Sequence, residues 1–171
     1  KSVLQRLTDA ASAQPGAAAA VLLSGEPGTG KRLIARLLHA SGRRCGRPFL
    51  SLDCAAVPSA RLESDFFGHD RDGWLRTQDA KPGMVANADG GTVFLDNIGA
   101  ADLTLQARFF ELLALKTVRR IGSLHEQRVD LHIIAASREP LQMLLDGRRL
   151  RTELSACLGE PLIVPPLRER G

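Results

Sequence analysis

The sequence lacks the features that mark membrane-spanning and disulfide-stabilised proteins. No apolar run reaches the roughly 18 residues that span a bilayer. No signal peptide is visible, and a chain that begins at Lys1 is expected to be a piece excised from a longer protein. The cysteines Cys45, Cys54 and Cys157 are odd in number and have no C-x-x-C spacing. We therefore expect reduced thiols in a cytoplasmic protein, with no contact to a membrane and no cysteine metal site.

A strong charge of either sign is also missing. The 23 Lys and Arg residues against 19 Asp and Glu residues give a net charge of +4. This balance is compatible with phosphate ligands or a nearby nucleic acid and demonstrates neither. No helix-turn-helix pattern and no internal repeat is found. The length of 171 residues and the hydrophobic share of 44% suffice for one domain with a core.

Apolar runs alternate with amphipathic segments along the chain. Strands are predicted at 17–23, 49–52, 91–96, 129–136 and 162–164. Helices are predicted at 2–13, 59–67, 103–115, 140–145 and 150–158. A further helix is predicted after the loop that follows the first strand, and it runs to about residue 40. A polar loop covers 68–83, and 119–128 indicates a turn between short extended pieces. Strands that alternate with helices predict an α/β fold, a parallel sheet covered on both faces.

A glycine-rich loop between the first strand and the following helix is the most informative segment. It fits G-x-x-x-x-G-K and consists of Gly25, Glu26, Pro27, Gly28, Thr29, Gly30 and Lys31. Glycines let backbone N–H groups converge on phosphate oxygens, and the helix N-terminus favours negative charge. An ordinary strand-to-helix turn is the competing interpretation, but both flanks agree with a phosphate loop. Arg32 stands where a Ser or Thr would help to hold magnesium.

Asp96 lies at the end of a predicted buried strand, where open α/β sheets place their ligands. In a P-loop protein such a carboxylate holds Mg²⁺ through water, whereas elsewhere it merely caps the next turn. Asn97 follows, at the place where ATPases of this layout carry Glu. An amide can orient the attacking water but cannot act as a base at neutral pH. Nucleotide binding is therefore expected to survive better than hydrolysis.

Many segments together resemble the AAA+ domain of bacterial enhancer-binding proteins, the sigma-54-dependent transcriptional activators. Residues 62–69 are similar to L-E-S-E-L-F-G-H, residues 88–96 to A-D-G-G-T-L-F-L-D, and residues 165–170 match P-P-L-R-E-R. Asp53 replaces the Asn of the family's N-C-A-A motif, which is thought to restrain the catalytic Glu. The resemblance covers essentially residues 1–171. It implies a P-loop NTPase (AAA+) three-layer α/β/α fold with a central parallel sheet, whose helical lid is absent from this fragment.

The departures from the family pattern concern its working parts. The mobile loop G-A-F-T-G-A, which touches sigma-54, falls without gaps on Asp72, Gly73, Trp74, Leu75, Arg76 and Thr77, and no residue agrees. Trp74 either replaces the family's Phe or lies on the domain's own surface. Of two arginines that the family offers to a neighbouring subunit's nucleotide, Arg151 remains as a finger or a solvated residue, and Cys157 replaces the other. Ser137 fills the γ-phosphate sensor position, or simply ends a strand.

Three hypotheses follow. The first is a transcription-regulator module that binds ATP and Mg²⁺ to control self-assembly into a hexameric ring or dimer, with impaired hydrolysis and no competent sigma-54 contact. It would serve RNA polymerase holoenzyme and reach DNA through a separate domain. The second is an active ATPase that remodels the holoenzyme, with Asn97 orienting water. The third is a regulator responsive to cyclic dinucleotides, whose phosphates would pair with Arg32, Arg36, Arg43 and Arg44 unless these form a solvated face.

Overall fold

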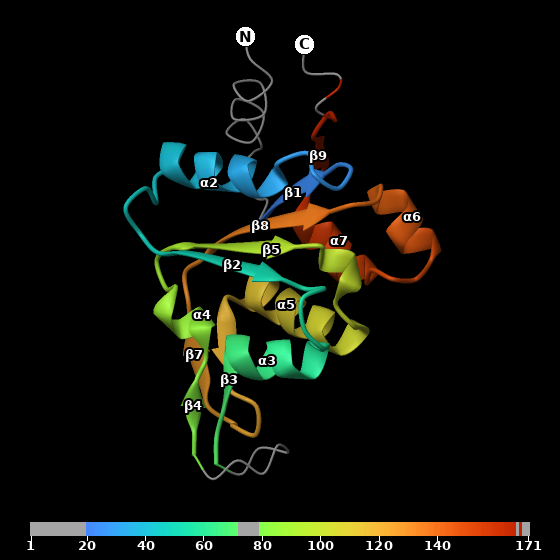
Figure 1. The fold of residues 1–171 in the computed structure, drawn as a ribbon. Coiled ribbons are helices and arrows are strands. Elements are labelled where there is room, and N and C mark those ends of the chain that lie inside the picture. Colours follow the sequence, from blue (N-terminus) through green and yellow to red (C-terminus); the bar gives the residue numbers. More distant parts are fainter. Residues whose placement is uncertain (1–19, 72–78, 167, 169–171) are drawn as a thin grey trace.

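A five-stranded parallel sheet forms the centre of the molecule (Figure 1). The computed structural model describes residues 20–71, 79–166 and 168. The strand order is β2-β5-β8-β1-β9, so the first strand in the chain lies between two that come late. All adjacent strands in this sheet pair in parallel. The strands are β1 (Ala20–Ser24), β2 (Phe49–Asp53), β5 (Thr92–Asp96), β8 (His132–Ser137) and β9 (Pro161–Ile163).

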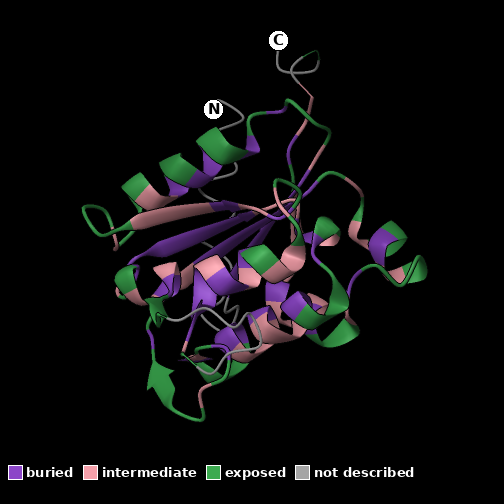
Figure 2. Cartoon of the chain, turned by 60° about the horizontal axis from the view of Figure 1, so that its bottom comes forward, coloured by how far each residue is buried: buried purple, intermediate pink, exposed green. Residues whose placement is uncertain are grey.

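Helices cover both faces of this sheet. Helix α2 (Lys31–Ser41) lies on one face, while α3 (Ser59–Phe67), α5 (Leu103–Leu115) and α7 (Thr152–Leu158) lie on the other. Figure 2 shows that each of these helices turns its buried residues toward the strands. The three-layer α/β/α arrangement predicted from the alternating pattern is thereby confirmed.

Two apolar clusters fill the spaces between the layers, because alternate strand residues point to opposite faces. Val21 and Leu23 pack with Ile34 and Leu38 of α2, whereas Leu22 belongs to the larger cluster on the other side. The predicted apolar stripe of α5 is buried in that larger cluster, with Phe109 fully inaccessible to solvent. Its members Leu105, Phe109, Leu112 and Leu113 are all among the core residues.

Two antiparallel hairpins project from the side of the molecule where α3 and α5 lie (Figure 1). One pairs β3 (Gly68–His69) with β4 (Lys81–Pro82), and the other pairs β6 (Thr117–Arg119) with β7 (Glu126–Arg128). A bridge between His69 and Ile121 joins the two hairpins. The predicted polar loop 68–83 therefore begins and ends in a paired neck, and Figure 1 shows this neck far from α2.

Most element predictions are confirmed, two of them to the residue. The helices at 59–67 and 103–115 have the predicted bounds. The strand predicted from 129 begins only at His132, because the Val129 N–H donates to the Lys116 carbonyl at the base of the β6–β7 hairpin. Two short helices complete the fold: α4 (Met84–Asn87), which apolar spacing did not predict, and α6 (Leu141–Asp146). The helix predicted at 2–13 lies outside the described residues.

Candidate functional site

Three predicted site elements meet at one edge of the sheet. The glycine loop follows β1, Asp96 ends β5 and Ser137 ends β8. Because β5, β8 and β1 are adjacent parallel strands, their carboxyl ends open onto the same edge. Ser24 and Ser137 are direct register partners, and the Gly25 N–H donates to the Ser137 carbonyl at 3.2 Å. The sheet topology thus brings the loop, the strand-end carboxylate and the sensor-position serine together.

The glycines of the loop adopt backbone conformations that other residues disfavour. Gly28 and Gly30 have φ values of 79° and 77°, in the left-handed region. Gly30 is the residue before α2, so the first N–H groups of that helix point toward the loop. At Gly25 a Cβ atom would lie 2.6 Å from the Val164 carbonyl oxygen. The loop therefore needs these glycines for its turn and for its close contact with the segment after β9.

Lys31 is held inside the loop and not in solvent. Its side chain is 7% exposed, and Nζ donates to the carbonyls of Gly25 at 2.6 Å and Glu26 at 2.8 Å. Burial lowers the pKa of Lys31, against the opposing attraction of Asp96, while Arg138 lowers it further. A buried cation whose charge is penalised gains most from an anion. The Lys31 ammonium group is thus enclosed by loop carbonyls at the N-terminus of α2.

Arg32 points away from the loop. Its guanidinium donates from Nε at 3.1 Å and from Nη2 at 2.8 Å to the Ser51 hydroxyl of β2. The predicted place of a magnesium-binding hydroxyl is therefore taken by a cation that is tied to a neighbouring strand. Thr29, the single hydroxyl residue of the loop 25–31, is buried and donates to the Glu26 carbonyl at 2.9 Å.

The outer rim of the loop is joined to the end of the described chain. Arg168 donates to both carboxylate oxygens of Glu26, at 2.8 and 2.9 Å. This pairing holds the pKa of Glu26 below its usual range. The Val164 N–H donates to the Ser24 carbonyl at 2.7 Å. Two residues of the segment 164–168 thus contact β1 and the phosphate loop.

Asp96 and Asn97 form the other side of the site. Asp96 is partly exposed at its strand end, as predicted, and is the Cα register partner of Asp53. Asn97 adopts the left-handed conformation, with φ 57° and ψ 52°, and leads into the short 3-10 helix Ile98–Ala100. The Asp53 carboxylate accepts from the Ala55 N–H at 2.9 Å, within its own turn. In the described residues no hydrogen bond joins Asp53 to Asn97, and no group of three metal-ligating side chains occurs.

Ser137 and Arg151 are held by neighbouring main-chain and side-chain groups. The Ser137 hydroxyl donates to the Glu139 carbonyl at 2.6 Å. Arg151 is the residue before α7, and its N–H donates to the Gln106 side-chain oxygen at 2.9 Å. Its guanidinium lies 3.7 Å from the Glu153 carboxylate and is 38% exposed. Arg151 is therefore at the surface, away from the interior of its own site.

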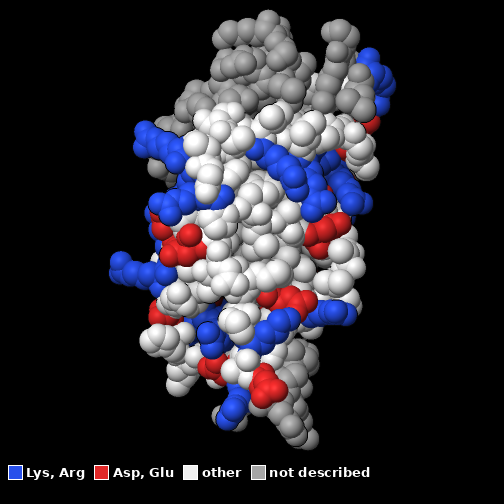
Figure 3. Space-filling view, turned by 60° about the vertical axis from the view of Figure 1, so that its left-hand side comes forward, with Lys and Arg blue, Asp and Glu red and all other residues white. Residues whose placement is uncertain are grey.

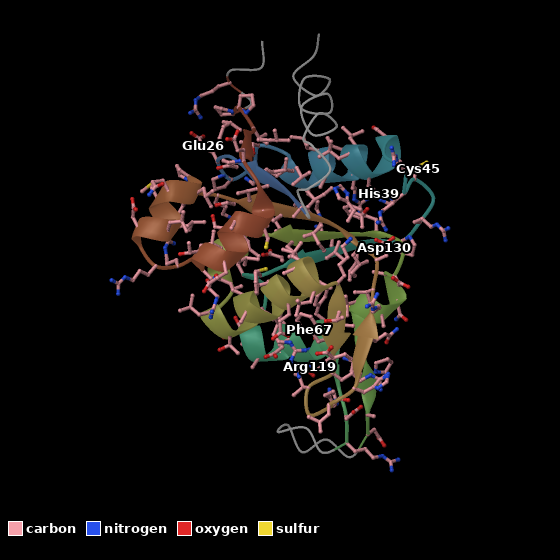
Figure 4. The ribbon with its side chains drawn as sticks, turned by 180° about the vertical axis from the view of Figure 1, so that it is seen from behind. Glu26, His39, Cys45, Phe67, Arg119 and Asp130 are labelled. Carbon is pink, nitrogen blue, oxygen red and sulfur yellow. The ribbon has the colours of Figure 1, made fainter. Side chains whose placement is uncertain are left out.

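The arginines of the third hypothesis do not gather at the loop. Arg36 lies over the Phe49 ring, 5.8 Å from its centroid, and Arg43 and Arg44 follow the far end of α2. Since α2 has 11 residues, its two ends are about 16 Å apart. Figure 4 shows Glu26 on one side of the molecule and Cys45 with Asp130 on the other. Figure 3 shows acidic and basic side chains interspersed on the side it presents, without a continuous basic patch.

Sequence reasoning missed several residues that support this site. Gln106 is fully buried, Arg149 forms an ion pair with Glu139, and Arg168 binds Glu26. Gln106 binds Arg149 and Arg151, 43 and 45 positions away, and the partners of Arg149 and Arg168 are 10 and 142 positions away, so local spacing does not identify these pairings. Residues 72–77 of the predicted partner loop lie outside the described residues. Within the described part of the chain, no helix has the length and apolarity needed to cross a bilayer.

Comparison with known proteins agrees with this geometry. The model of the Sigma-54 interaction domain matches residues 1–160. The chain is 42% identical over 153 residues to the Regulatory protein AtoC of Escherichia coli (strain K12), covering 89% of this chain and 33% of that protein. It is 41% identical over 151 residues to the Nif-specific regulatory protein of Bradyrhizobium diazoefficiens, covering 88% and 26%. The chain thus spans about a third or less of the length of these relatives.

Solved structures show the same fold. NtrX from Brucella abortus in complex with ATP matches with a TM-score of 0.83 at 26% identity, covering 98% of this chain and 35% of that chain. NtrX in complex with ADP matches with a TM-score of 0.82 at 25% identity, covering 99% and 37%. The family match over most of the chain, the relatives above 40% identity and the P-loop fold lead to one conclusion. The chain belongs to the Sigma-54 interaction domain family, the AAA+ module of bacterial enhancer-binding proteins.

Proposed function

We propose that this domain binds ATP, or a related purine nucleotide, as part of a transcription regulator. The observation that carries the proposal is the buried ammonium of Lys31 inside a loop of left-handed glycines at a helix N-terminus. Gly25, Glu26, Pro27, Gly28, Thr29, Gly30 and Lys31 would surround the phosphates. The match to NtrX structures that contain ADP and ATP supports this ligand class. On binding, Lys31 exchanges two loop carbonyls for phosphate oxygens.

Magnesium fits this site with one carboxylate and without a hydroxyl at position 32, where Arg32 stands. Asp96 would hold Mg²⁺ through water, because it ends the central strand β5 and is close enough to affect the pKa of Lys31. Arg32 offers no ligand atom, and its guanidinium is bound to Ser51. When bound, the metal ion neutralises phosphate charge. We therefore expect it to be held mainly by the nucleotide itself.

Hydrolysis is proposed to be impaired. Asn97 supplies an amide where a base is needed, and Cys157 replaces one of two arginines. Arg151 is exposed at the start of α7, where it is available to a nucleotide on a neighbouring copy of the domain. An arginine supplied in this way is typically worth about 10³ to 10⁵ in rate. With one arginine and no base, slow turnover is expected.

Binding without turnover is sufficient to control assembly. A nucleotide that is bound more tightly by one oligomeric state shifts the population toward that state. We propose that ATP occupancy favours a ring or dimer of the full-length regulator, which acts on RNA polymerase and reaches DNA through another domain. Residues 72–77 share nothing with the family's sigma-54 contact loop. The proposed module therefore does not remodel sigma-54 holoenzyme.

Titration of the full-length protein with a fluorescent ATP analogue tests the binding proposal. Lys31→Ala removes the loop cation and is expected to weaken binding at least about 30-fold, from the loss of a charge-assisted bond of about 2 to 3 kcal/mol. Lys81→Ala is the matched control, because Lys81 is an exposed lysine paired with Asp65 in the β3–β4 hairpin. Equal affinity of the wild type and Lys31→Ala would overturn the proposal.

Phosphate release separates the proposed module from an active ATPase. The proposal expects wild-type release close to that of Lys31→Ala at every protein concentration, while sedimentation shows larger assemblies with ATP than without it. Release that is far above the Lys31→Ala control and rises with protein concentration would instead support a working ATPase completed by Arg151 in trans.

A further inference from the structure

A chain of hydrogen bonds begins beside the phosphate loop. The hydroxyls of Ser24 and Ser137, on adjacent strands, donate to the same acceptor, the Glu139 carbonyl, at 3.4 and 2.6 Å. The Glu139 N–H in turn donates to the Ser137 hydroxyl at 3.1 Å. The Ser137 hydroxyl at the end of β8 is thus hydrogen-bonded to both the carbonyl and the N–H of Glu139, two residues further along the chain.

The side chain of Glu139 carries the connection across the surface. Both of its carboxylate oxygens accept from the guanidinium of Arg149, and the Nη1–Oε1 distance is 2.8 Å. The pKa of Glu139 lies below its ordinary range because Arg149 hydrogen-bonds to it. Two parallel bonds fix the orientation of both groups and not only their distance. The turn after β8 therefore holds the segment just before α7.

Gln106 completes the connection inside the protein. Its side-chain nitrogen donates to the carbonyls of Ala101 at 2.8 Å and Arg149 at 2.7 Å, and its oxygen accepts from the Arg151 N–H at 2.9 Å. Gln106 is fully buried on α5, so each of these bonds is costly to lose. The side-chain amide of Gln106 thus connects Arg149 and Arg151 to Ala101, the residue that follows the 3-10 helix.

We propose that Glu139, Arg149 and Gln106 are positioning residues. They couple the hydrogen bonding of the Ser137 hydroxyl, which lies beside the glycine loop, to the orientation of Arg151. The inference rests on the proposed nucleotide site. The Ser137 hydroxyl has one proton, which it now donates to the Glu139 carbonyl. If it donates to a γ-phosphate instead, that carbonyl loses its strongest partner and the Glu139 turn shifts. The ion pair and Gln106 transmit the shift to Arg151, the residue proposed above to reach a neighbouring copy of the domain.

The exposure of the ion pair favours such a role over a purely stabilising one. The two side chains are 48% and 40% exposed, and exposed pairs contribute little to stability. Arg148 provides a matched control: it is the adjacent arginine, and its side chain makes no hydrogen bond or ion pair within the described residues. Replacement of either arginine by Met removes the same charge, but only Arg149→Met breaks the chain of contacts.

Hydrogen–deuterium exchange of full-length protein, with a non-hydrolysable ATP analogue, ADP or no nucleotide, tests the coupling. In the wild type, peptides covering 149–155 are expected to exchange at different rates with the two nucleotides. Glu139→Gln and Arg149→Met are expected to keep analogue affinity within about threefold and to lose most of this difference. Arg148→Met should retain it, and the swap of Glu139→Arg with Arg149→Glu should restore it.

The outcomes separate this inference from the proposed function. Nucleotide binding without any wild-type difference at 149–155, or a difference that persists in both Glu139→Gln and Arg149→Met, would overturn the coupling and leave the binding site standing. Failure of the wild type to bind either nucleotide would overturn the proposed function and the coupling together.

Discussion

Single residues decide the chemistry expected of this domain, and Asn97 is the clearest case. It follows the carboxylate of β5 and holds a left-handed conformation. Asn tolerates this backbone better than most residues, because its short amide bonds locally. Asn97 thus has a backbone conformation that suits its residue type, and a Glu at this position must overcome that preference.

Asn97→Glu is expected to raise phosphate release at least tenfold over the wild type. A positioned general base is worth about 10² to 10⁴ in rate, and the left-handed backbone at Asn97 is expected to limit this gain. The measurement is steady-state phosphate release by full-length protein at saturating ATP. Asn87→Glu, in the exposed position at the end of α4, adds the same charge elsewhere and should change nothing. An unchanged rate in Asn97→Glu, with ATP still bound, would show that another part limits hydrolysis.

Among the elements, the neck of the β3–β4 hairpin is a place where two chain segments approach very closely. Gly68 has φ 80°, and a Cβ there would lie 2.4 Å from the Gly83 nitrogen. A Cβ on Gly83 would lie 2.3 Å from the Phe67 carbonyl carbon. The two strands of the neck cross where neither has a side chain. Both sides of the neck therefore require glycine.

Gly68→Ala is expected to destabilise the domain by about 3 kcal/mol or more, because strain and a backbone clash add. Urea denaturation measures the loss. Gly46→Ala is a matched control, since Gly46 has the same φ of 80° but open space around its missing Cβ. It should lose only about 1 kcal/mol from backbone strain. Equal losses in the two variants would mean that the neck relaxes around the added methyl group.

A second contact joins the loop after α2 to the segment just before β8. Arg44 donates to the Asp130 carboxylate at 2.7 Å and to the Asp130 carbonyl at 3.0 Å. The Arg44 hydrogen bond holds the pKa of Asp130 below its ordinary value. A carboxyl whose pKa is lowered by folding stabilises the folded state above its unfolded pKa of about 3.9, and this stability is lost as the pH falls through the folded pKa.

Asp130→Asn should make the free energy of unfolding depend less on pH below about pH 5. The wild type is expected to lose slightly more free energy of unfolding between pH 5 and pH 2 than the variant does. The difference stays below about 1 kcal/mol, because the Asp130 side chain is 70% exposed. Thermal unfolding followed at several pH values provides the measurement, with Asp79→Asn as an exposed control. Parallel profiles for the wild type and Asp130→Asn would contradict the assignment.

At the scale of the whole molecule, the end of the described chain meets the glycine loop. Arg168, the last described residue, pairs with Glu26 of the loop after β1. The guanidinium neutralises a carboxylate that would otherwise repel the triphosphate of the proposed ligand. The segment after β9 therefore contributes to the charge at the glycine loop.

Arg168→Gln is expected to weaken binding of the fluorescent ATP analogue about threefold to tenfold, because Glu26 is left unneutralised near the phosphates. The double variant Glu26→Gln with Arg168→Gln removes both charges and should recover most of the affinity. The difference between the single and double variants should shrink at high salt, since exposed charges are screened. A double variant that binds as weakly as Arg168→Gln would show that the arginine contacts the nucleotide directly.

Local patterns were sufficient for most of the fold. The stripe of α5 and the strand-end position of Asp96 follow from spacing that a local chain segment already contains. The glycine loop was readable because its requirement for left-handed backbone at Gly28 and Gly30 is met by residue type alone. Such features depend on neighbours within a few positions, so the sequence by itself determined the α/β class and the phosphate loop.

Contacts between distant segments were decided only by the tertiary structure. The strand order places β8 beside β1, so Ser137 lies next to the loop although more than 100 residues separate them. Arg32 directly follows the glycine loop, and only the fold shows that its guanidinium is bound to Ser51. The buried amide of Gln106 has partners from two other segments. Side-chain direction and long-range pairing depend on how the layers pack, and no local pattern carries that information.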